Sequence, residues 1–198
     1  MKFKIFDLYD MDEVKVTDEA LKPYLNLEPK LLLKFQGRNE GKFFAAKVHI
    51  VERVANRIAV PGHVGKKHRI MTFWASGQYR NNMKIVLKAF EIIQKKKNEN
   101  PVQVLVRAIE NSAPRDETTT IEYGGARYPQ AVDVSPLRRI NLAIRWLVQG
   151  AYQKSFAKKR KCRNHLQMRL LWRLKVIWKD ILYKRRTSQK SKQILLGN

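Results

Sequence analysis

Three carboxylates in the middle of the chain, Asp116, Glu117 and Asp133, are the residues best suited by type to catalysis. Two-metal hydrolysis needs carboxylates that converge on divalent ions, so a metal-dependent nuclease is one interpretation. The other is that Asp116 and Glu117 follow Arg115 in a turn, while the charge of Asp133 suits the N-terminus of the next helix. We favour the second interpretation. The sequence also contains no Ser, His and Asp arrangement with a recognisable nucleophile. We therefore predict that the protein is not an enzyme.

The remaining candidates for metal or phosphate chemistry are weaker. His63 and His68 have no acidic or cysteine ligand close by in the sequence, and Cys162 with His165 makes only half a site. The segment 62–68 is rich in glycine and lysine but lacks the spacing and the hydroxyl of a P-loop. We expect no metal and no cofactor. The basic loop between Gly62 and Gly77 is either a solvated loop or a phosphate-contacting one, and we favour phosphate contact. Its basic residues are Lys66, Lys67 and Arg69.

Charge dominates the composition, with 41 Lys and Arg against 17 Asp and Glu, a net charge of +24 over 198 residues. A field of this sign favours a polyanion, either nucleic acid or an anionic membrane surface. Apolar runs such as 31–33 and 170–172 are far shorter than the roughly 18 residues of a membrane span. The acidic N-terminus has no signal-peptide pattern, and the one cysteine fits a reducing compartment. We expect a cytoplasmic protein without a membrane partner.

Apolar periodicity predicts the helices that must position these groups. The sequence predicts helices over 47–60, from about 82 to 97, from Pro101 after an Asn100 cap, and from Pro136 after a Ser135 cap. The first 35 residues have no clear period, so we predict an irregular N-terminal arm, with at most a short strand, that contributes little to the core. Residues 36–156 are expected to form the folded domain.

Residues 118–134 change to a period of two, and Gly124 and Gly125 at the centre indicate a hairpin. Pro129 gives up a ladder donor, which restricts the hairpin to a two-stranded ribbon. Tyr123, Arg127 and Tyr128 surround its tip, and such side chains stack on unpaired bases and contact phosphates. The alternative is a ribbon that packs on its own domain. The predicted fold is mainly α, a helical bundle of about five to six helices with a protruding β-ribbon.

Five stretches of the chain resemble the small-subunit ribosomal protein seven family, in its archaeal and eukaryotic branch. They are YLNLEP (24–29), KVHIVERVANR (47–57), NPVQVLVRAIENSAPRDETT (100–119), YGGARYPQAVDVSPLRR (123–139) and LAIRWLVQGA (142–151). The resemblance implies a structural protein that binds the 3′ major domain of small-subunit ribosomal RNA and helps to nucleate assembly of the head. It also implies a position beside the exit-site transfer RNA and the messenger exit, among neighbouring proteins of the head and platform.

The resemblance further implies which residues contact RNA. Matched to the family's motifs, the contacting residues are Lys42, Lys47, Arg53, Arg115, Arg127, Tyr128, Arg138, Arg139 and Arg145. A helical DNA-binding regulator is the main alternative, but it would pair a recognition helix with a dimer surface. Dispersed arginines and a ribbon suit shape and phosphate recognition better.

The resemblance stops after Phe156, and the basic segment 157–198 follows. Residues 156–198 hold 14 Lys and Arg and the single acid Asp180, so 14 − 1 = +13 lies there and 27 − 16 = +11 in the preceding 155. The codons of Asn164 to Leu171, read one base out of frame, can spell the family's Ser-Leu-Ala-Asp-Glu-Ile-Ile. We hypothesise a reading-frame shift near residues 158–164, which sequencing of the gene tests. The alternative is a basic amphipathic tail that lies on RNA or an anionic membrane.

Overall fold

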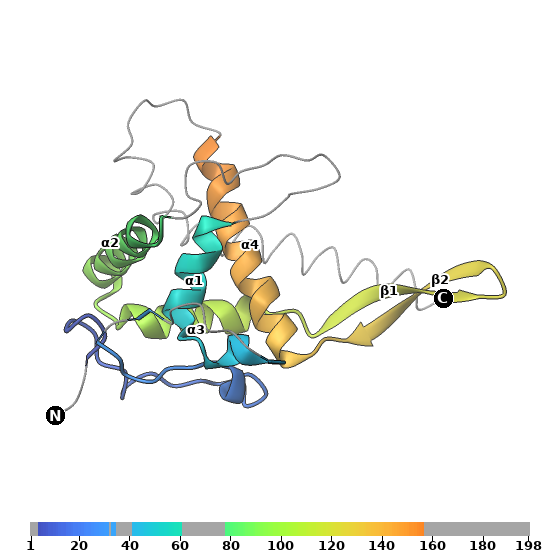
Figure 1. Cartoon of the computed structure of the whole chain (residues 1–198), viewed down its shortest axis with the longest axis horizontal. Helices are drawn as coiled ribbons and strands as arrows, with labels where there is room; N and C mark the ends of the chain where they lie inside the picture. Colours follow the sequence, from blue (N-terminus) through green and yellow to red (C-terminus); the bar gives the residue numbers. More distant parts are fainter. Residues whose placement is uncertain (1–3, 32, 35–40, 61–77, 157–198) are drawn as a thin grey trace.

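The computed structural model describes residues 4–31, 33–34, 41–60 and 78–156. The elements are two 3-10 helices, η1 (Lys22–Tyr24) and η2 (Phe44–Lys47), then α1 (Ile50–Ala59), α2 (Tyr79–Lys97), α3 (Pro101–Ser112), β1 (Asp116–Tyr123), β2 (Ala126–Asp133) and α4 (Pro136–Phe156). The helices form one body, from which the two strands project as a ribbon (Figure 1). The predicted mainly helical fold with a protruding ribbon is confirmed.

Helix α1 organises the core, because it packs against both α2 and α4. Its residues Ile50, Val51 and Ala55 are completely buried, at the spacing expected for one face of a helix. Helix α3 in turn packs against α2 and α4 and buries Val102 and Ile109. The predicted apolar stripes therefore point inward.

The helix N-termini show how the sequence sets the boundaries. Asn100 accepts a hydrogen bond at Oδ1 from the backbone N–H of Val102 at 3.0 Å, which confirms the predicted cap before Pro101. Helix α2 begins at Tyr79, three residues earlier than predicted. The Tyr79 hydroxyl donates to the carbonyl of Leu33 in the arm, and this long-range contact gave no periodic signal in the sequence.

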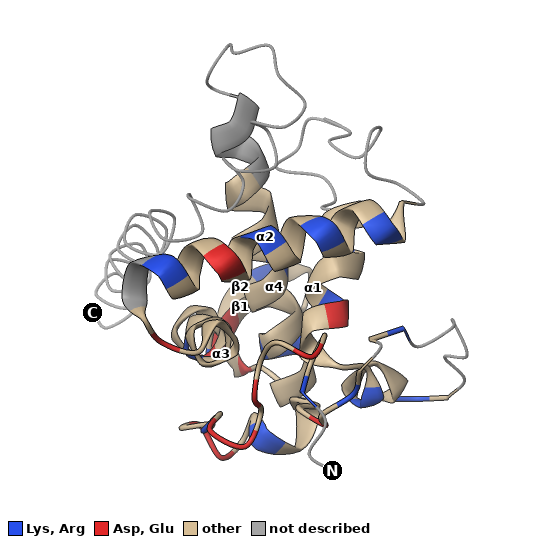
Figure 2. Ribbon diagram, turned by 90° about the vertical axis from the view of Figure 1, so that its left-hand side faces the viewer, with Lys and Arg blue, Asp and Glu red and all other residues tan. Residues whose placement is uncertain are grey.

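The N-terminal arm, residues 4–34, differs most from its prediction. It was expected to contribute little to the core, yet its side chains join the same buried cluster as the helices. That prediction was wrong, because an irregular backbone can still bury apolar side chains against helices formed later in the chain. Figure 2 shows acidic residues gathered along this arm. The buried arm residues are Ile5, Tyr9, Met11, Leu21, Leu25 and Leu33.

Polar side chains of α3 hold the arm in place. The Gln103 amide accepts from the backbone N–H of Lys15 at 2.7 Å and donates to the carbonyl of the same residue at 3.0 Å. The Glu110 carboxylate accepts from the N–H groups of Thr17 and Asp18 at 2.6 and 3.1 Å. These side chains satisfy arm backbone groups that have no secondary-structure partner.

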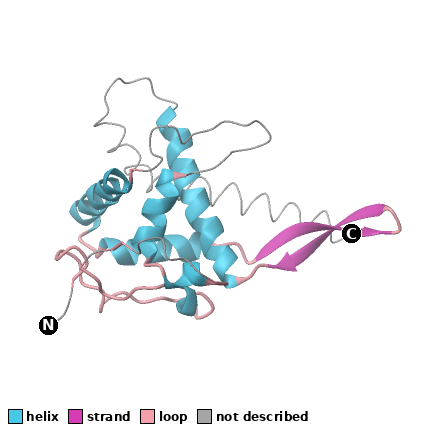
Figure 3. Cartoon of the chain, in the orientation of Figure 1, coloured by secondary structure: helices cyan, strands magenta, loops and turns pink. Residues whose placement is uncertain are grey.

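Figure 3 shows the two strands of the ribbon beside each other. They pair antiparallel, in a register that runs from Asp116 opposite Asp133 to Tyr123 opposite Ala126. Gly124 and Gly125 form the turn with φ angles of 56° and 82°, a conformation that glycine adopts without a steric penalty. The hairpin and its turn were predicted correctly. Asp116 and Glu117, however, are the first residues of β1 and not part of a turn.

No helix in the described ranges is long and apolar enough to span a membrane. The loop with Lys66, Lys67 and Arg69 and the segment 157–198 lie outside the residues that the structure describes. The predictions for both segments stay predictions.

Candidate nucleic-acid interface

The arginines of α4 have different surroundings because helix geometry turns neighbouring side chains about 100° apart. Arg138 and Arg145, seven residues apart, are both exposed, whereas Arg139 between them is buried. Arg139 pairs with Asp18 of the arm at 2.8 Å and donates from Nε to the carbonyl of Pro114 at 3.1 Å. Arg138 and Arg145 can therefore meet a ligand, while Arg139 joins α4 to the arm and to the start of the ribbon.

Arg53 of α1 was expected to contact RNA, but the structure places it inside the protein. Its guanidinium donates to the carbonyl of Tyr24 at 3.0 Å and to Oδ1 of Asn141 at 2.8 Å. Burial lowers the pKa of Arg53 to about 10, so the group still carries its charge at neutral pH. Arg53 thus connects the arm, α1 and α4 from a buried position.

Lys42 and Lys47 both lie on the exposed segment before α1. The Lys47 ammonium lies 5.5 Å from the centre of the Phe44 ring, close enough for a cation–π contact. The side-chain amide of Asn26 donates to the Lys47 carbonyl at 2.6 Å, which fixes the backbone of this segment against the arm. The ammonium groups of Lys42 and Lys47 therefore belong to a segment whose backbone is held against the arm.

The basic residues of α2 and also Arg57 of α1 were missed by the sequence analysis. Arg80, Lys84 and Lys88 recur every four residues on the exposed side of α2, and Figure 2 shows basic residues along this helix. Burial, and then the nearby charge of Arg145, lowers the pKa of Arg57, so α1 and α4 bring two guanidinium groups close together. The period of four in α2 was readable in the sequence, but the proximity of Arg57 to Arg145 was not.

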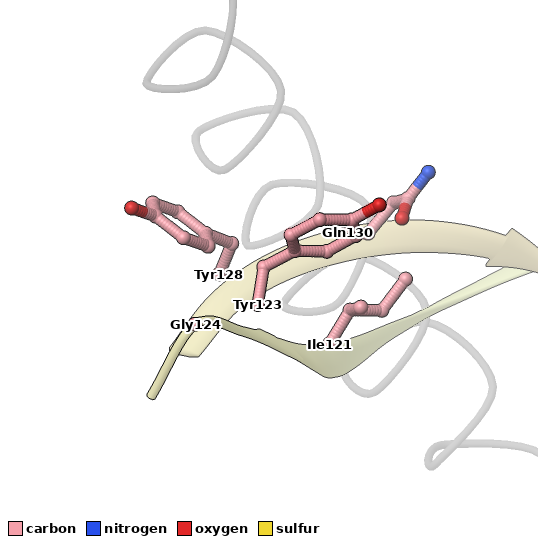
Figure 4. Close-up of a pocket in the computed structure, with 5 residues that line it drawn as sticks. All are labelled: Ile121, Tyr123, Gly124, Tyr128 and Gln130. Carbon is pink, nitrogen blue, oxygen red and sulfur yellow. The ribbon is translucent and has the colours of Figure 1, made fainter. Parts of the chain in front are cut away.

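The ribbon has two unlike faces, because successive side chains of a strand alternate between them. Ile121, Tyr123, Tyr128 and Val132 share one face through the register, and all four are exposed. They are half of the large apolar side chains that the described surface exposes. Figure 4 shows Ile121, Tyr123, Tyr128 and Gln130 around a hollow on this face, near Gly124 of the turn. Tyr123 and Tyr128 near the tip are exposed in the described part of the chain, and Figure 1 shows the ribbon projecting from the helices.

The opposite face and the root of the ribbon carry ion pairs. Arg127 near the tip lies 3.4 Å from Glu122, its direct partner across the strands. Arg138 at the start of α4 lies 2.7 Å from Glu117 at the root, and this partner raises the pKa of the Arg138 guanidinium. Arg115 is exposed at the same root, where its carbonyl accepts from the N–H of Val134 at 2.9 Å.

The three carboxylates considered for a nuclease do not form one group. Asp116 and Asp133 are direct partners across the strands and share one face of the ribbon. Glu117 points to the face that carries Val132, and it pairs with Arg138 of α4. The described residues contain no group of three acidic, histidine or cysteine side chains that could hold a metal ion. His63, His68, Cys162 and His165 lie outside these residues.

A family model and individual known proteins both match this chain, and they agree with each other. The family model described as ribosomal protein S7p/S5e matches residues 32–172. The small ribosomal subunit protein uS7 of Nanoarchaeum equitans is 50% identical over 156 residues, which cover 78% of this chain and 79% of that protein. Proteins of the same name from Methanothermobacter thermautotrophicus and Methanococcus aeolicus are 43% and 42% identical, over 79% and 81% of this chain and 78% and 80% of their own lengths.

Proposed function

Because the chain belongs to the ribosomal protein S7p/S5e family, a family of structural and non-enzymatic proteins of the small ribosomal subunit, we propose that it binds the 3′ major domain of small-subunit ribosomal RNA. In this proposal it helps to nucleate assembly of the subunit head. Its ribbon lies near the exit-site transfer RNA and the messenger exit, and its other neighbours are ribosomal proteins of the head and platform.

The observation that carries the proposal is the position of the exposed cations on the helical body. Arg115 and Arg138 lie at the ribbon root, and Arg145 follows two turns along α4. Guanidinium groups contact phosphate oxygens in two-pronged geometry, and an array of them fixes a protein on a folded RNA. Lys42 and Lys47 add two exposed ammonium groups on the segment before α1.

The ribbon contributes a different kind of contact. Tyr123 is 80% exposed and Tyr128 59%, although tyrosine normally buries much of its ring. Two rings displayed on a protruding ribbon suit stacking on unpaired bases, each worth about 1–3 kcal/mol on replacement by alanine. Such contacts fit single-stranded RNA, and Arg127 adds one cation at the tip.

Direct binding tests this proposal. The full chain should bind a transcript of the 3′ major domain more tightly than a 5′-domain transcript or a DNA duplex of equal length. The DNA duplex represents a regulator that reads a major groove, and equal affinity for all three ligands would overturn the proposal. The comparison is made at one fixed salt concentration, because nucleic-acid affinities change steeply with salt.

A further inference from the structure

The ribbon is acidic, although it belongs to a strongly basic protein. Its two strands hold four carboxylates, Asp116, Glu117, Glu122 and Asp133, and the single arginine Arg127, a net charge of −3. Phosphates are repelled by charge of this sign. These carboxylates weaken the attraction between the ribbon and RNA, so their presence on the ribbon requires an explanation.

Two of these carboxylates lie on arginines of the proposed RNA-binding surface. Glu117 is 2.7 Å from Nε of Arg138, and Glu122 is 3.4 Å from Nε of Arg127. The first pair joins the ribbon root to α4, and the second crosses the strands beside the tip. A guanidinium that holds a carboxylate must release it, or share its donors, before it can hold a phosphate in the same way.

Stability alone does not explain these pairs. The side chains of Arg127 and Glu122 are 74% and 60% exposed, and those of Arg138 and Glu117 are 61% and 35% exposed. Ion pairs this exposed contribute little to folding. Asp116 and Asp133, moreover, face each other as like charges across the strands, which is unfavourable for the ribbon itself. Their effect on an approaching phosphate is repulsive as well.

We propose that Glu117 and Glu122 are internal counter-ions that limit how tightly the ribbon holds RNA. This inference rests on the proposed function, because that function places the ribbon beside RNAs that move through the ribosome. A phosphate that reaches Arg138 or Arg127 replaces a carboxylate, which then remains close and repels it. The contact is therefore weak, and differences in affinity between related complexes appear mainly in the dissociation rate.

The test compares four full-length proteins: the wild-type chain, Glu117→Gln, Glu122→Gln and the double variant. Glutamine keeps the size and shape of each side chain, removes its charge and replaces one acceptor oxygen by an NH2 donor. Glu99→Gln is the matched control, because Glu99 pairs with Arg107 at 3.6 Å with both side chains about half exposed, outside the ribbon. Each protein is titrated with the 3′ major domain transcript and with an unstructured single-stranded RNA, and dissociation rates are measured.

We expect the double variant to bind both RNAs about threefold to tenfold more tightly, mainly through slower dissociation, and the control to change by less than about twofold. The gain from Glu117→Gln should disappear when Arg138 is already alanine. A double variant that binds no more tightly than the control overturns the inference, as does a Glu117→Gln gain that persists without Arg138.

The proposed function can fail separately from this inference. A wild-type chain that does not prefer the ribosomal transcript overturns both. If the wild-type chain binds the transcript and loses affinity on Arg138→Ala, but the glutamine variants behave like the control, only the inference fails. Thermal unfolding of each variant checks that the substitution has left the helical body folded.

Discussion

Arg53 and Arg138 carry the same side chain in opposite surroundings. Arg53 is 8% exposed and donates to the arm and to α4, whereas Arg138 lies at the surface with one carboxylate. Arg53→Ala removes the guanidinium that donates to the Tyr24 carbonyl and to Oδ1 of Asn141. We expect the free energy of unfolding to fall by about 2–4 kcal/mol, measured by denaturant titration. Arg138→Ala is the control and should leave stability nearly unchanged.

The same two variants should behave in the reverse way when RNA binding is measured. Arg138→Ala should weaken binding to the 3′ major domain transcript and flatten its salt dependence, by about 0.9 in the logarithmic slope for a contact on duplex RNA. Arg127→Ala should act similarly at the tip. Folded Arg53→Ala protein should keep the wild-type slope. If the slope stays the same in Arg138→Ala and Arg127→Ala, these arginines are not phosphate contacts.

His49 makes the stability of the protein depend on pH. Its Nδ1 accepts from the N–H of Val51 at 3.2 Å as the cap of α1, and Nε2 is buried without a hydrogen-bond partner among the described atoms. Burial, and then the charge of Lys30, lowers the pKa of His49 from 6.5 to about 4. A protonated ring could not accept the hydrogen bond from Val51, so this hydrogen bond also favours the neutral ring and a lowered pKa of His49.

The sign of the effect follows from the lowered pKa. Between pH 6.5 and about 4 the unfolded chain binds a proton that the folded chain does not, so stability is lost as the pH falls through this range. We expect His49 to account for a loss of about 3 kcal/mol in the free energy of unfolding. His49→Asn keeps a capping side chain and should remove most of this slope in unfolding experiments at several pH values. An unchanged pH dependence in this variant would show that His49 is not the responsible group.

At the scale of elements, the arm depends on α3. Glu110 accepts two backbone N–H groups of the arm, so Glu110→Ala should lower the free energy of unfolding by about 1–3 kcal/mol. Proteolysis should also cut the chain around Thr17 faster. Glu99→Ala, which removes only a surface ion pair, serves as control and should stay within about 0.5 kcal/mol of the wild type. Equal behaviour of both variants would mean that Glu110 does not hold the arm.

The elements with local signals could be predicted from the sequence. Asn100 before Pro101 identified the start of α3, and Gly124 with Gly125 identified the ribbon turn, because caps and turns are decided by neighbouring residues. The arm could not be predicted in the same way. Its buried residues Ile5 and Leu21 have no shared period and find their partners only after the chain has folded back.

The candidate interface was predicted less completely than the fold. Motif and charge pointed to Arg138 and Arg145 on the surface, but the same reasoning included Arg53 and Arg139, which are buried. The type of residue shows that a cation is present, whereas the helical face and the long-range partner decide whether a ligand can reach it. Asp18, the partner of Arg139, lies 121 residues away in the sequence.

For the whole molecule, the placement of charge means more than its total. Helix α4 carries four basic residues and no acid, and α2 carries six basic residues and one acid. The ribbon and the arm are acidic or nearly neutral by comparison, so the described helices offer RNA its most favourable surface. The net charge of +24 indicated a polyanion as partner, and the fold shows which elements can meet it.

The most direct test of this account is co-sedimentation of the full chain with small ribosomal subunits lacking their own copy of the protein. We predict that the wild-type chain sediments with the subunits in stoichiometric amount at moderate salt. The triple variant Arg115→Ala, Arg138→Ala, Arg145→Ala should remain folded but largely stay in the supernatant. A wild-type chain that does not sediment with the subunits would contradict the account, and so would a triple variant that binds as well as the wild type.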